Sequence, residues 1–337
     1  MVVMADDGIA FDGLTAEAGP LGGAETAFVG LAEALAARGH QVEARSRCQA
    51  VLIYKGVRWA PLEGGTPDRC DLYIGNRSYR VVGLSPGARR RVFWIHNPAR
   101  YLRKPRYLWP LVRYRPTLIV SSAAHARTVP AWLPRGGCEI IPYGILETFR
   151  RAEHREPPPP VALFTSNPLR GLAWLLDLWA DRIAPAVPSA ELHIYAGAAV
   201  YGGAGSARMR TALDRADGLQ SIGVHHYPPV GREVLATVLA RARAMLYRGD
   251  AGETFCLAVA EAQAMGVPAI VQPLGSLGER VIDGISGRIA HSDDIFAEAA
   301  IAVLRGNELW RRWHLGALAH QRGLSWDEVA ARFERLM

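Results

Sequence analysis

The chain has 337 residues, enough for two domains, and half of them are hydrophobic while 21% are charged, a balance typical of globular proteins. No apolar run reaches the ~20 residues that a membrane-spanning helix needs, and the four scattered cysteines contain no CxxC pair. These features exclude an integral membrane protein, argue against a structural zinc site or a disulfide framework, and predict a cytoplasmic protein. The net charge of +7 is concentrated in residues 1–155, which carry 22 Lys and Arg against 13 Asp and Glu, whereas the remainder carries 17 against 19.

The first half of the chain alternates helical and strand-like segments. Residues 24–38 read as a helix that Gly39 ends. Short apolar runs then predict strands at 71–74, 91–95, 117–121 and 139–142. Four prolines, Pro157–Pro160, must be extended, and they predict a stiff linker near the middle of the chain.

The second half repeats the alternation. Strands are predicted at 161–165, 191–195, 244–247 and 268–272, and helices at 171–183, 231–243 and 257–265. Strands separated by helices imply parallel sheets covered on both faces. We therefore expect two doubly wound α/β domains, at 1–155 and 156–322, with an amphipathic helix at 323–337. Ligands of such folds bind at the carboxyl ends of the strands, so a cleft between the domains is the expected site.

Two glutamates spaced eight residues apart mark the strongest candidate site. Glu253 precedes a predicted helix that begins near Phe255, and Glu261 lies about two turns along it. Two such carboxylates can accept hydrogen bonds from two sets of sugar hydroxyls, while the free N–H groups of the first turn bind a diphosphate. This pattern suits a nucleotide sugar. The alternative is that Glu253 is a capping acid and Glu261 a solvated helix residue.

Three other positions fit the same ligand. Arg170 follows a predicted strand, and a guanidinium at that position can bind a diphosphate. Gly22 and Gly23 precede the first helix, whose N-terminus attracts anions. His96 ends the strand-like run VFWIH. The alternatives are a surface arginine, an ordinary turn and a histidine with a structural hydrogen bond.

These segments together resemble the retaining glycosyltransferase family 4, which has the GT-B fold of two Rossmann-like domains facing across a cleft. The similar segments follow the family's order over most of the chain: GPLGGAETAFVGLAEALAARGHQV, IIPYGI, FTSNPLRGLAWLL, ETFCLAVAEAQAMGVPAIV and PLGSLGERVIDGISGRI. The Glu-x7-Glu signature is the most specific of them. The resemblance implies a bacterial enzyme of glycan biosynthesis that moves a hexose, with retention, from a nucleotide diphosphate sugar to a glycan, glycolipid or small-molecule hydroxyl. It also implies that the helix at 323–337 packs back on the first domain.

The resemblance also implies roles for individual residues. Glu253 would contact the transferred sugar, Glu261 the ribose, and His96 the sugar near its reacting carbon. Arg170 would neutralise the departing diphosphate. Further contacts to the donor would come from the backbone of Gly22, Gly23, Phe255, Cys256, Leu257, Gly275, Ser276 and Leu277. Two positions depart from the family pattern: Thr165 stands where a second basic residue is common, and Cys256 where glycine is usual.

No cofactor beyond the donor is expected, and UDP- or GDP-sugars are the favoured donors. Arg170 and the helix N-terminus can stabilise the leaving diphosphate, and the chain lacks the Asp-x-Asp triplet of manganese-dependent transferases. We therefore expect a metal-independent reaction.

The segment from Arg89 to Arg115 predicts an anionic partner. It contains nine Lys and Arg residues, no acid, and interleaved aromatic residues. Such a mixture suits either an acidic acceptor or the anionic inner face of the cell membrane. The alternative is a solvated arginine-rich loop with its aromatic residues packed inward. Nucleic acid is a poorer interpretation, because no recognition motif accompanies the charge.

Two other classes of function compete with a retaining transferase. Another GT-B enzyme, either a sugar-nucleotide epimerase or an inverting transferase, would share the fold, and His96 could then serve as a base. A binding module would hold a nucleotide sugar without chemistry. The sequence argues against a nicotinamide dehydrogenase, since no G-x-G-x-x-G follows an early strand.

Overall fold

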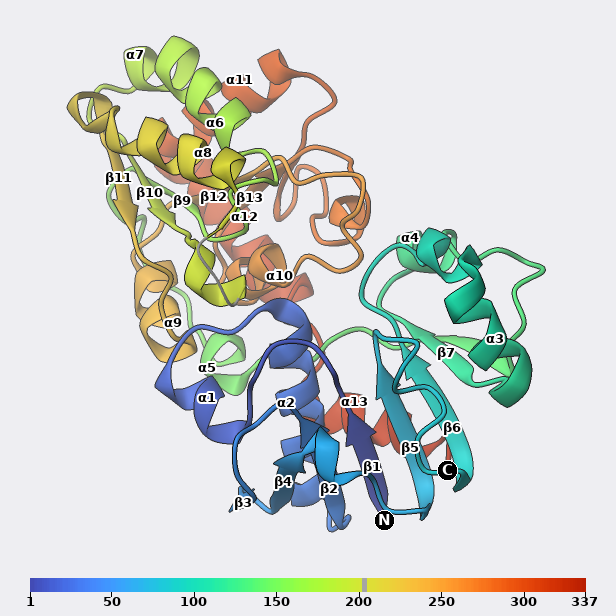
Figure 1. Ribbon diagram of the computed structural model, residues 1–337. Coiled ribbons are helices and arrows are strands. Elements are labelled where there is room, and N and C mark those ends of the chain that lie inside the picture. The colour runs from blue at the N-terminus through green and yellow to red at the C-terminus, as the bar shows by residue number, and fades with distance from the viewer. Residues whose placement is uncertain (202–204) are drawn as a thin grey trace. The chain divides into compact units, whose positions relative to one another are not determined.

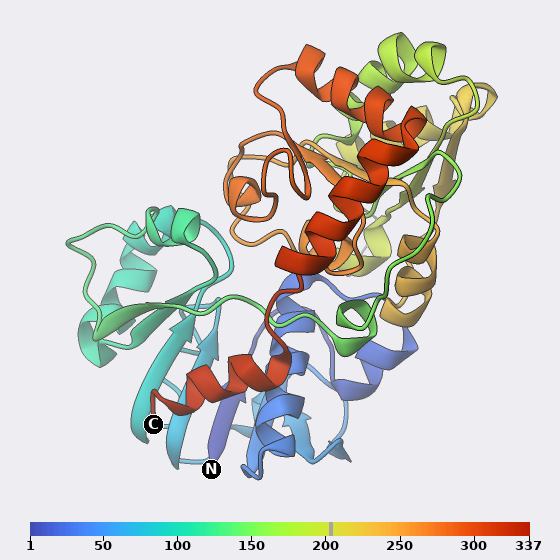
Figure 2. The ribbon, with the colours of Figure 1, turned by 180° about the vertical axis from the view of Figure 1, so that it is seen from behind.

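The computed structural model describes residues 1–201 and 205–337 (Figures 1 and 2). The chain divides into two compact units. The first comprises Met1–Gly144 and Leu324–Met337, and the second Ile145–Gly323. Within the described residues, no helix is both long and apolar enough to cross a membrane.

The first unit is built on an eight-stranded sheet with the order β3-β4-β2-β1-β5-β6-β7-β8. All neighbouring strands are parallel except β3 and β4. The four residues of β1 are all buried, as expected of a central strand that is covered on both faces. The strands are β1 (Val2–Ala5), β2 (Val42–Ser46), β3 (Leu52–Tyr54), β4 (Val57–Pro61), β5 (Arg69–Asn76), β6 (Gly87–Trp94), β7 (Thr117–Val120) and β8 (Gly137–Ile140).

Helices and short turns connect these strands: α1 (Gly13–Ala18), α2 (Gly23–Ala37), η1 (Leu62–Gly64), η2 (Ala99–Arg103), α3 (Pro105–Tyr114) and α4 (Ala123–Ala126). The C-terminal helix α13 (Trp326–Glu334) also belongs to this unit and lies beside α2 (Figures 1 and 2). Arg38 at the end of α2 forms ion pairs of 2.7 Å with Asp327 and Glu334. The Phe333 ring packs edge-on against Trp94. These contacts attach the end of the chain to its first unit.

The second unit contains a fully parallel six-stranded sheet with the order β11-β10-β9-β12-β13-β14. The strand order reverses between β9 and β12, as in doubly wound folds. The strands are β9 (Val161–Phe164), β10 (Glu191–Tyr195), β11 (Val224–Tyr227), β12 (Ala244–Tyr247), β13 (Ala269–Val271) and β14 (Gly287–Ile289).

The helices of the second unit are α5 (Glu147–Arg150), α6 (Leu172–Leu178), α7 (Ala184–Ala186), α8 (Ala207–Asp217), α9 (Arg232–Ala240), α10 (Leu257–Ala264), α11 (Asp293–Arg305) and α12 (Asn307–His320). Short turns lie at η4 (Ala198–Tyr201), η5 (Gln220–Ile222) and η6 (Leu277–Glu279). The helix predicted at 171–183 ends its α-helical part at Leu178 and continues as a π-helix, η3 (Trp179–Ile183). Pro185 follows η3, and a proline ring would clash with the carbonyl four residues earlier in a regular helix.

The proline run does not join the two units. The structure divides the chain at Gly144, earlier than the predicted boundary after residue 155, and again at Gly323. The reason is that the segment before the prolines is bonded to the second unit. The Arg155 side chain donates to the Met265 carbonyl at 2.8 Å, and Arg322 donates to the Arg150 carbonyl at 2.7 Å. Pro157–Pro160 therefore lead into β9 from within the second unit.

Candidate functional site

The carboxyl ends of three neighbouring strands gather the polar residues of the second unit. Strands β9, β12 and β13 are adjacent and parallel, so the loops that follow them lie at the same edge of the sheet. Arg170 follows β9, Glu253 follows β12, and Gly275 follows β13. This edge contains the point where the strand order reverses, which is where doubly wound sheets bind ligands.

Arg170 and Glu253 form the central ion pair of this edge. Arg170 Nη1 lies 2.6 Å from Glu253 Oε2, and Arg170 Nε lies 3.5 Å from Asp250 Oδ2. The Tyr247 hydroxyl donates a hydrogen bond to Glu253 Oε1. Glu253 is only 4% exposed, whereas the Arg170 side chain is 35% exposed. Burial opposes the charged form of Arg170, but Glu253, Tyr247 and Asp250 together outweigh burial and raise the pKa of the guanidinium, with Glu253 contributing most.

Helix α10 begins at Leu257, as in the predicted range 257–265, and not near Phe255, where the predicted anion site would place its start. Cys256 precedes the helix with a φ of 63°, in the left-handed region that no right-handed helix contains. The backbone therefore turns sharply at Cys256, and Phe255 lies outside the helix. Burial raises the pKa of the Cys256 thiol well above its ordinary value, and the charge of Glu253 adds to this effect. The Arg280 guanidinium lies 4.5 Å from the centre of the Phe255 ring, which places a second cation beside this turn.

Glu261 is buried within the unit. It is 2% exposed, and both of its carboxylate oxygens accept hydrogen bonds from Arg232 Nη1, at 2.6 and 2.5 Å. Arg232 is the first residue of α9. Burial raises the pKa of Glu261 to about 7, against the opposing effect of the Arg232 charge and hydrogen bonds. The alternative interpretation of Glu261 as a solvated helix residue is therefore wrong.

The loop after β13 packs on the backbone of Glu253. Gly275 has a φ of 56°, and a Cβ atom there would come within 2.4 Å of the Glu253 carbonyl oxygen. The Ser276 N–H donates to that same oxygen at 2.9 Å, and the Leu277 N–H donates to Leu274 O at 3.1 Å. Two of the three backbone donors expected to face a ligand are thus engaged within the protein, and the one from Ser276 holds the backbone of Glu253 in place.

In the first unit, Gly22 and Gly23 stand at the beginning of α2, as expected. Gly22 is the N-cap residue, with a φ of −62°, and provides no side-chain cap. A Cβ atom at Gly23 would meet no other atom within 4 Å among the described residues, so open space adjoins the backbone there. This open backbone at a helix N-terminus suits the approach of an anion.

His96 lies in a buried hydrogen-bonded network. It is 9% exposed, its Nε2 is bonded to Asn76 Oδ1, and its Nδ1 lies 2.5 Å from the Tyr143 hydroxyl. Asn76 in turn donates to Asp6, which pairs with Arg77 at 2.7 Å. Burial lowers the pKa of His96 well below its ordinary value, and the charge of Arg77 lowers it further, so the ring is neutral at pH 7. Both ring nitrogens have protein partners, which agrees with the alternative that His96 makes structural hydrogen bonds.

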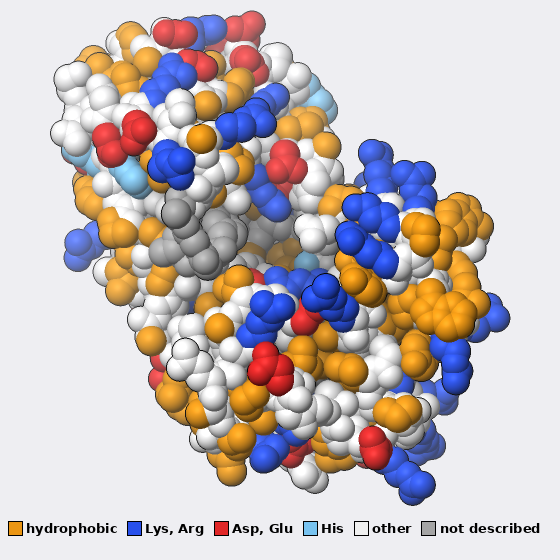
Figure 3. Space-filling model, in the orientation of Figure 1, with side chains coloured by type: hydrophobic (Ala, Val, Ile, Leu, Met, Phe, Trp, Pro, Cys, Tyr) orange, Lys and Arg blue, Asp and Glu red, His pale blue; other side chains and the backbone are white. Residues whose placement is uncertain are grey.

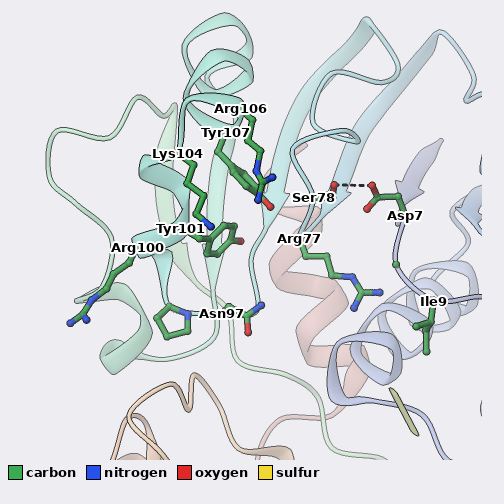
Figure 4. Close-up of a pocket in the computed structure, with 12 residues that line it drawn as sticks. Asp7, Ile9, Arg77, Ser78, Asn97, Arg100, Tyr101, Lys104, Arg106 and Tyr107 are labelled. Carbon is green, nitrogen blue, oxygen red and sulfur yellow. Dashed lines mark hydrogen bonds between the residues drawn. The ribbon is translucent and has the colours of Figure 1, made fainter. Parts of the chain in front are cut away.

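A pocket of about 760 Å³ lies in the first unit at the carboxyl ends of β1, β5 and β6 (Figure 4). Four cations and one acid line it, a net charge of +3. Arg106 stacks over the Tyr79 and Tyr107 rings, and Asp7 accepts a 2.8 Å hydrogen bond from Ser78. The lining residues are Asp7, Gly8, Ile9, Arg77, Ser78, Asn97, Pro98, Arg100, Tyr101, Lys104, Arg106 and Tyr107.

Three of the pocket cations have no acidic partner. Arg77 pairs with Asp6 and Glu25, but in residues 1–201 and 205–337 no carboxylate forms an ion pair with Arg100, Lys104 or Arg106. Figure 3 shows Lys and Arg side chains beside hydrophobic ones over α3 and α4, on the face drawn. One basic residue of the Arg89–Arg115 segment is structural, since Arg91 donates to the carbonyls of residues 82, 84 and 85.

The sequence analysis did not predict several residues of these sites. Tyr247, the last residue of β12, could have been noticed as a hydroxyl placed directly before the Glu253 loop. Nothing in the sequence distinguishes Arg232 or Arg280 from the other arginines. Asn76 ends β5 and could have been paired with His96, which follows the neighbouring strand β6.

Comparison with known proteins finds similarity that is concentrated in the second unit. Residues 159–306 match the family described as glycosyl transferases group 1, over less than half of the chain. The second unit therefore resembles group 1 glycosyl transferases. The chain is 32% identical over 131 residues to a D-inositol 3-phosphate glycosyltransferase of Streptomyces griseus, and 35% identical over 133 residues to that of Streptomyces coelicolor. Each match covers 36% of this chain and 28% of the relative, so the chain spans less than a third of these relatives.

Solved structures of glycosyltransferases share the fold of the whole chain. A sucrose-phosphate synthase from Thermosynechococcus elongatus superposes with a TM-score of 0.77 at 17% identity, covering 99% of this chain and 97% of that one. Anabaena HepE in complex with UDP-glucose gives 0.72 at 12% identity, covering 99% and 98%. The resemblance to family 4 and the prediction of two Rossmann-like α/β domains of the GT-B type are confirmed.

Proposed function

We propose that this chain is a glycosyltransferase that binds a nucleotide diphosphate sugar at the β9–β12–β13 edge of its second unit. The observation that carries the proposal is the pairing of Arg170 with the buried Glu253 at the point where the strand order reverses. The match of residues 159–306 to group 1 glycosyltransferases supports it. HepE, a protein of the same fold, binds UDP-glucose, which favours a UDP-sugar over a GDP-sugar as the first donor to test.

In this proposal Arg170 exchanges partners during the reaction. Without donor it neutralises Glu253 and lies near Asp250; with donor bound, its exposed guanidinium turns to the diphosphate. Glu253 then accepts hydrogen bonds from the hydroxyls of the transferred sugar, while Tyr247 and the loop at Ser276 hold it in position. Positive charge placed in advance beside the leaving diphosphate is the largest contribution to such a reaction.

In the proposal, the Glu261 carboxylate accepts a hydrogen bond from a hydroxyl of the donor's ribose. A ribose hydroxyl would have to compete with Arg232 for the carboxylate, so donor binding shifts Arg232 away from at least one Glu261 oxygen. Thr165 stands where a second basic residue is common in the family that the chain resembles. In the proposal Arg280, whose guanidinium lies over the Phe255 ring, supplies this second positive charge for the diphosphate. Retention of anomeric configuration and independence from metal ions also belong to the proposal, and we assign no protein nucleophile.

The first unit binds the acceptor in the proposal, in the pocket between Asp7 and Tyr107. The unpaired Arg100, Lys104 and Arg106 favour an acceptor that carries a phosphate or carboxylate beside the reacting hydroxyl. The relatives from Streptomyces are named for a phosphorylated acceptor, which agrees with such a charge. His96 takes part through the Asn76 and Tyr143 network and would reach the donor sugar only after releasing one of these partners.

Exposed apolar side chains on α3 favour a second role for the first unit. Trp109 is 71% exposed and Val112 56% exposed, both on α3 among the arginines. A helix with this composition suits the anionic inner face of the cell membrane. Sedimentation with vesicles containing phosphatidylserine tests the role. We expect binding that weakens in Trp109→Ser, and equal sedimentation of both proteins would exclude a contribution of α3.

The proposed function is tested by incubating the purified chain with UDP- and GDP-hexoses and measuring release of the nucleoside diphosphate. We expect release from one donor, its loss in Glu253→Gln, and its persistence in the control Glu298→Gln, whose side chain is exposed on α11. Activity after chelation of divalent ions tests metal independence, and the product's anomeric configuration separates retention from inversion. Donor binding without turnover would instead support a binding module, and interconversion of the donor an epimerase.

A further inference from the structure

Two histidines and a glutamate share one face at the edge of the second sheet. On β10, Glu191 and His193 alternate with the buried Leu192 and Ile194, so their side chains point to the same side of the sheet. His225 on the edge strand β11 lies directly opposite His193 in the parallel register. The topology therefore places three side chains with metal-binding groups next to one another.

The three groups are close enough to share one ion. His193 Nε2 lies 2.6 Å from Glu191 Oε2, and His225 Nε2 lies 3.9 Å from the same oxygen. All three ligand atoms fall within 4.8 Å of one another. The two imidazole rings are 5.4 Å apart and nearly perpendicular, and the Tyr227 ring packs 5.4 Å from His193. The side chains are 48%, 20% and 38% exposed for Glu191, His193 and His225, so an ion can reach them from solvent.

We propose that Glu191, His193 and His225 bind Zn²⁺ or a similar transition-metal ion, with both imidazole Nε2 atoms, one carboxylate oxygen and water as ligands. Imidazole and carboxylate are ordinary zinc ligands, with bonds of about 2.0–2.2 Å that put tetrahedral ligands roughly 3.3 Å apart. The observed separations of 2.6 and 3.9 Å lie on either side of that value. Small side-chain rotations would reach it, and the metal would replace the hydrogen bond between Glu191 and His193.

The place of the site in the fold indicates a structural role. Glu191 and His225 lie near the amino ends of β10 and β11, whereas Arg170 and Glu253 follow the carboxyl ends of β9 and β12. In a parallel sheet these are opposite ends, so the metal would not take part in donor binding. It would join the edge strand β11 to β10 and stabilise that edge.

The test is calorimetric titration of the full, tag-free chain with zinc chloride at pH 7.5. We expect one ion per chain, and at least tenfold weaker binding in both His193→Ala and His225→Ala. The matched control is His226→Ala. His226 is the next residue on β11, but its ring faces the opposite side of the sheet and is bonded to Asp217 and the Ala196 carbonyl. Its replacement should leave zinc binding unchanged.

A second measurement separates ligand loss from misfolding. Cobalt(II) bound to the wild-type chain should give the visible absorption of a tetrahedral site, and the spectrum should be lost in His193→Ala while its circular dichroism remains that of the wild type. Zinc binding that is absent in the wild type, unchanged in both histidine variants, or lost equally in His226→Ala would overturn the proposal. None of these outcomes depends on transferase activity.

Discussion

Arg77 in the first unit and Arg170 in the second both follow the carboxyl end of a central strand, and both pair with a buried carboxylate. Their surroundings differ. Arg77 binds two buried acids, Asp6 and Glu25, each at 2.7 Å. Arg170 binds one buried acid, Glu253, and has a longer contact of 3.5 Å with Asp250, whose side chain is 45% exposed.

The difference separates an arginine that holds the fold from one that can release its partner. Removing Arg77 would leave two buried carboxylates, one of them wholly inaccessible, without their cation. In the proposed function, Arg170 turns toward the donor while the Tyr247 hydroxyl keeps its hydrogen bond to Glu253. A strand-end arginine therefore indicates a ligand site when its own pairing is incomplete.

The largest expected effect is on folding, in Arg77→Met. The variant leaves Asp6 and Glu25 buried beside an apolar side chain, so we expect the free energy of unfolding to fall by about 3–5 kcal/mol. Chemical denaturation measures the loss. Arg80→Met is the control, because Arg80 is exposed and should change stability by less than about 0.5 kcal/mol. A loss at Arg77 no greater than at Arg80 would contradict the structural role.

The second prediction concerns catalysis. Arg170→Ala should lower the transfer rate at saturating donor by about 10²–10³-fold, because a positioned stabiliser of the leaving group is removed. Arg170→Lys should restore part of the rate, since it keeps the charge but lacks the planar fork of donors. Arg182→Ala, which removes an exposed arginine paired with Asp294, is the control. A full rate in Arg170→Ala would reject its proposed role.

The third prediction uses the buried pair of Glu261 and Arg232. Because the pKa of Glu261 is raised to about 7 from its ordinary 4.5, the folded chain holds this proton more tightly than the unfolded chain does. The stabilising contribution is complete below pH 4.5 and is lost as the pH rises to 7, with a total of about 3 kcal/mol. Glu261→Gln cannot titrate, so the stability of the wild type relative to the variant should fall across that window.

Urea denaturation of both proteins at intervals from pH 4.5 to pH 8 measures this difference. The histidines that are buried in the neutral form contribute equally to both proteins and cancel. If the difference in unfolding free energy stayed constant with pH, the prediction would be contradicted. Arg232 would then keep Glu261 ionised over the whole pH range.

The smallest expected effect is at the turn before α10. Cys256→Ala and Cys256→Gly both remove the thiol, but only glycine adopts a φ of 63° without strain. We expect Cys256→Gly to be more stable than Cys256→Ala by about 1 kcal/mol in thermal or chemical unfolding. The same two substitutions at Cys138 in β8 serve as the control, because glycine should be the less stable there. The reverse order at Cys256 would show that packing dominates the turn.

The local pattern predicted the three strands β9, β12 and β13 at the proposed donor site. The bounds predicted for β10 and β12 agree with the structure residue for residue, because each is a short β-type run delimited by helix and loop signals. The bounds of α2 were also predicted to within one residue at either end, since Gly39, with a φ of 90°, ends the helix. In contrast, β1, β2, β3, β4, β11 and β14 were not predicted from the local pattern. The VHHY sequence of the edge strand β11 has two histidines in place of apolar residues, so it lacks the apolar run by which the other strands were predicted.

The amino-acid sequence by itself determined the alternation of strands and helices, the resemblance to a family, and the loops that carry Arg170 and Glu253, because these features depend on neighbours along the chain. Only the tertiary structure decided that Glu261 is buried against Arg232 and that His193 meets His225. Each of these pairings joins segments that are distant in sequence, and no local pattern encodes which of the 37 arginines lies beside a given carboxylate. The burial that raises the pKa of Glu261 arises only when those segments pack together.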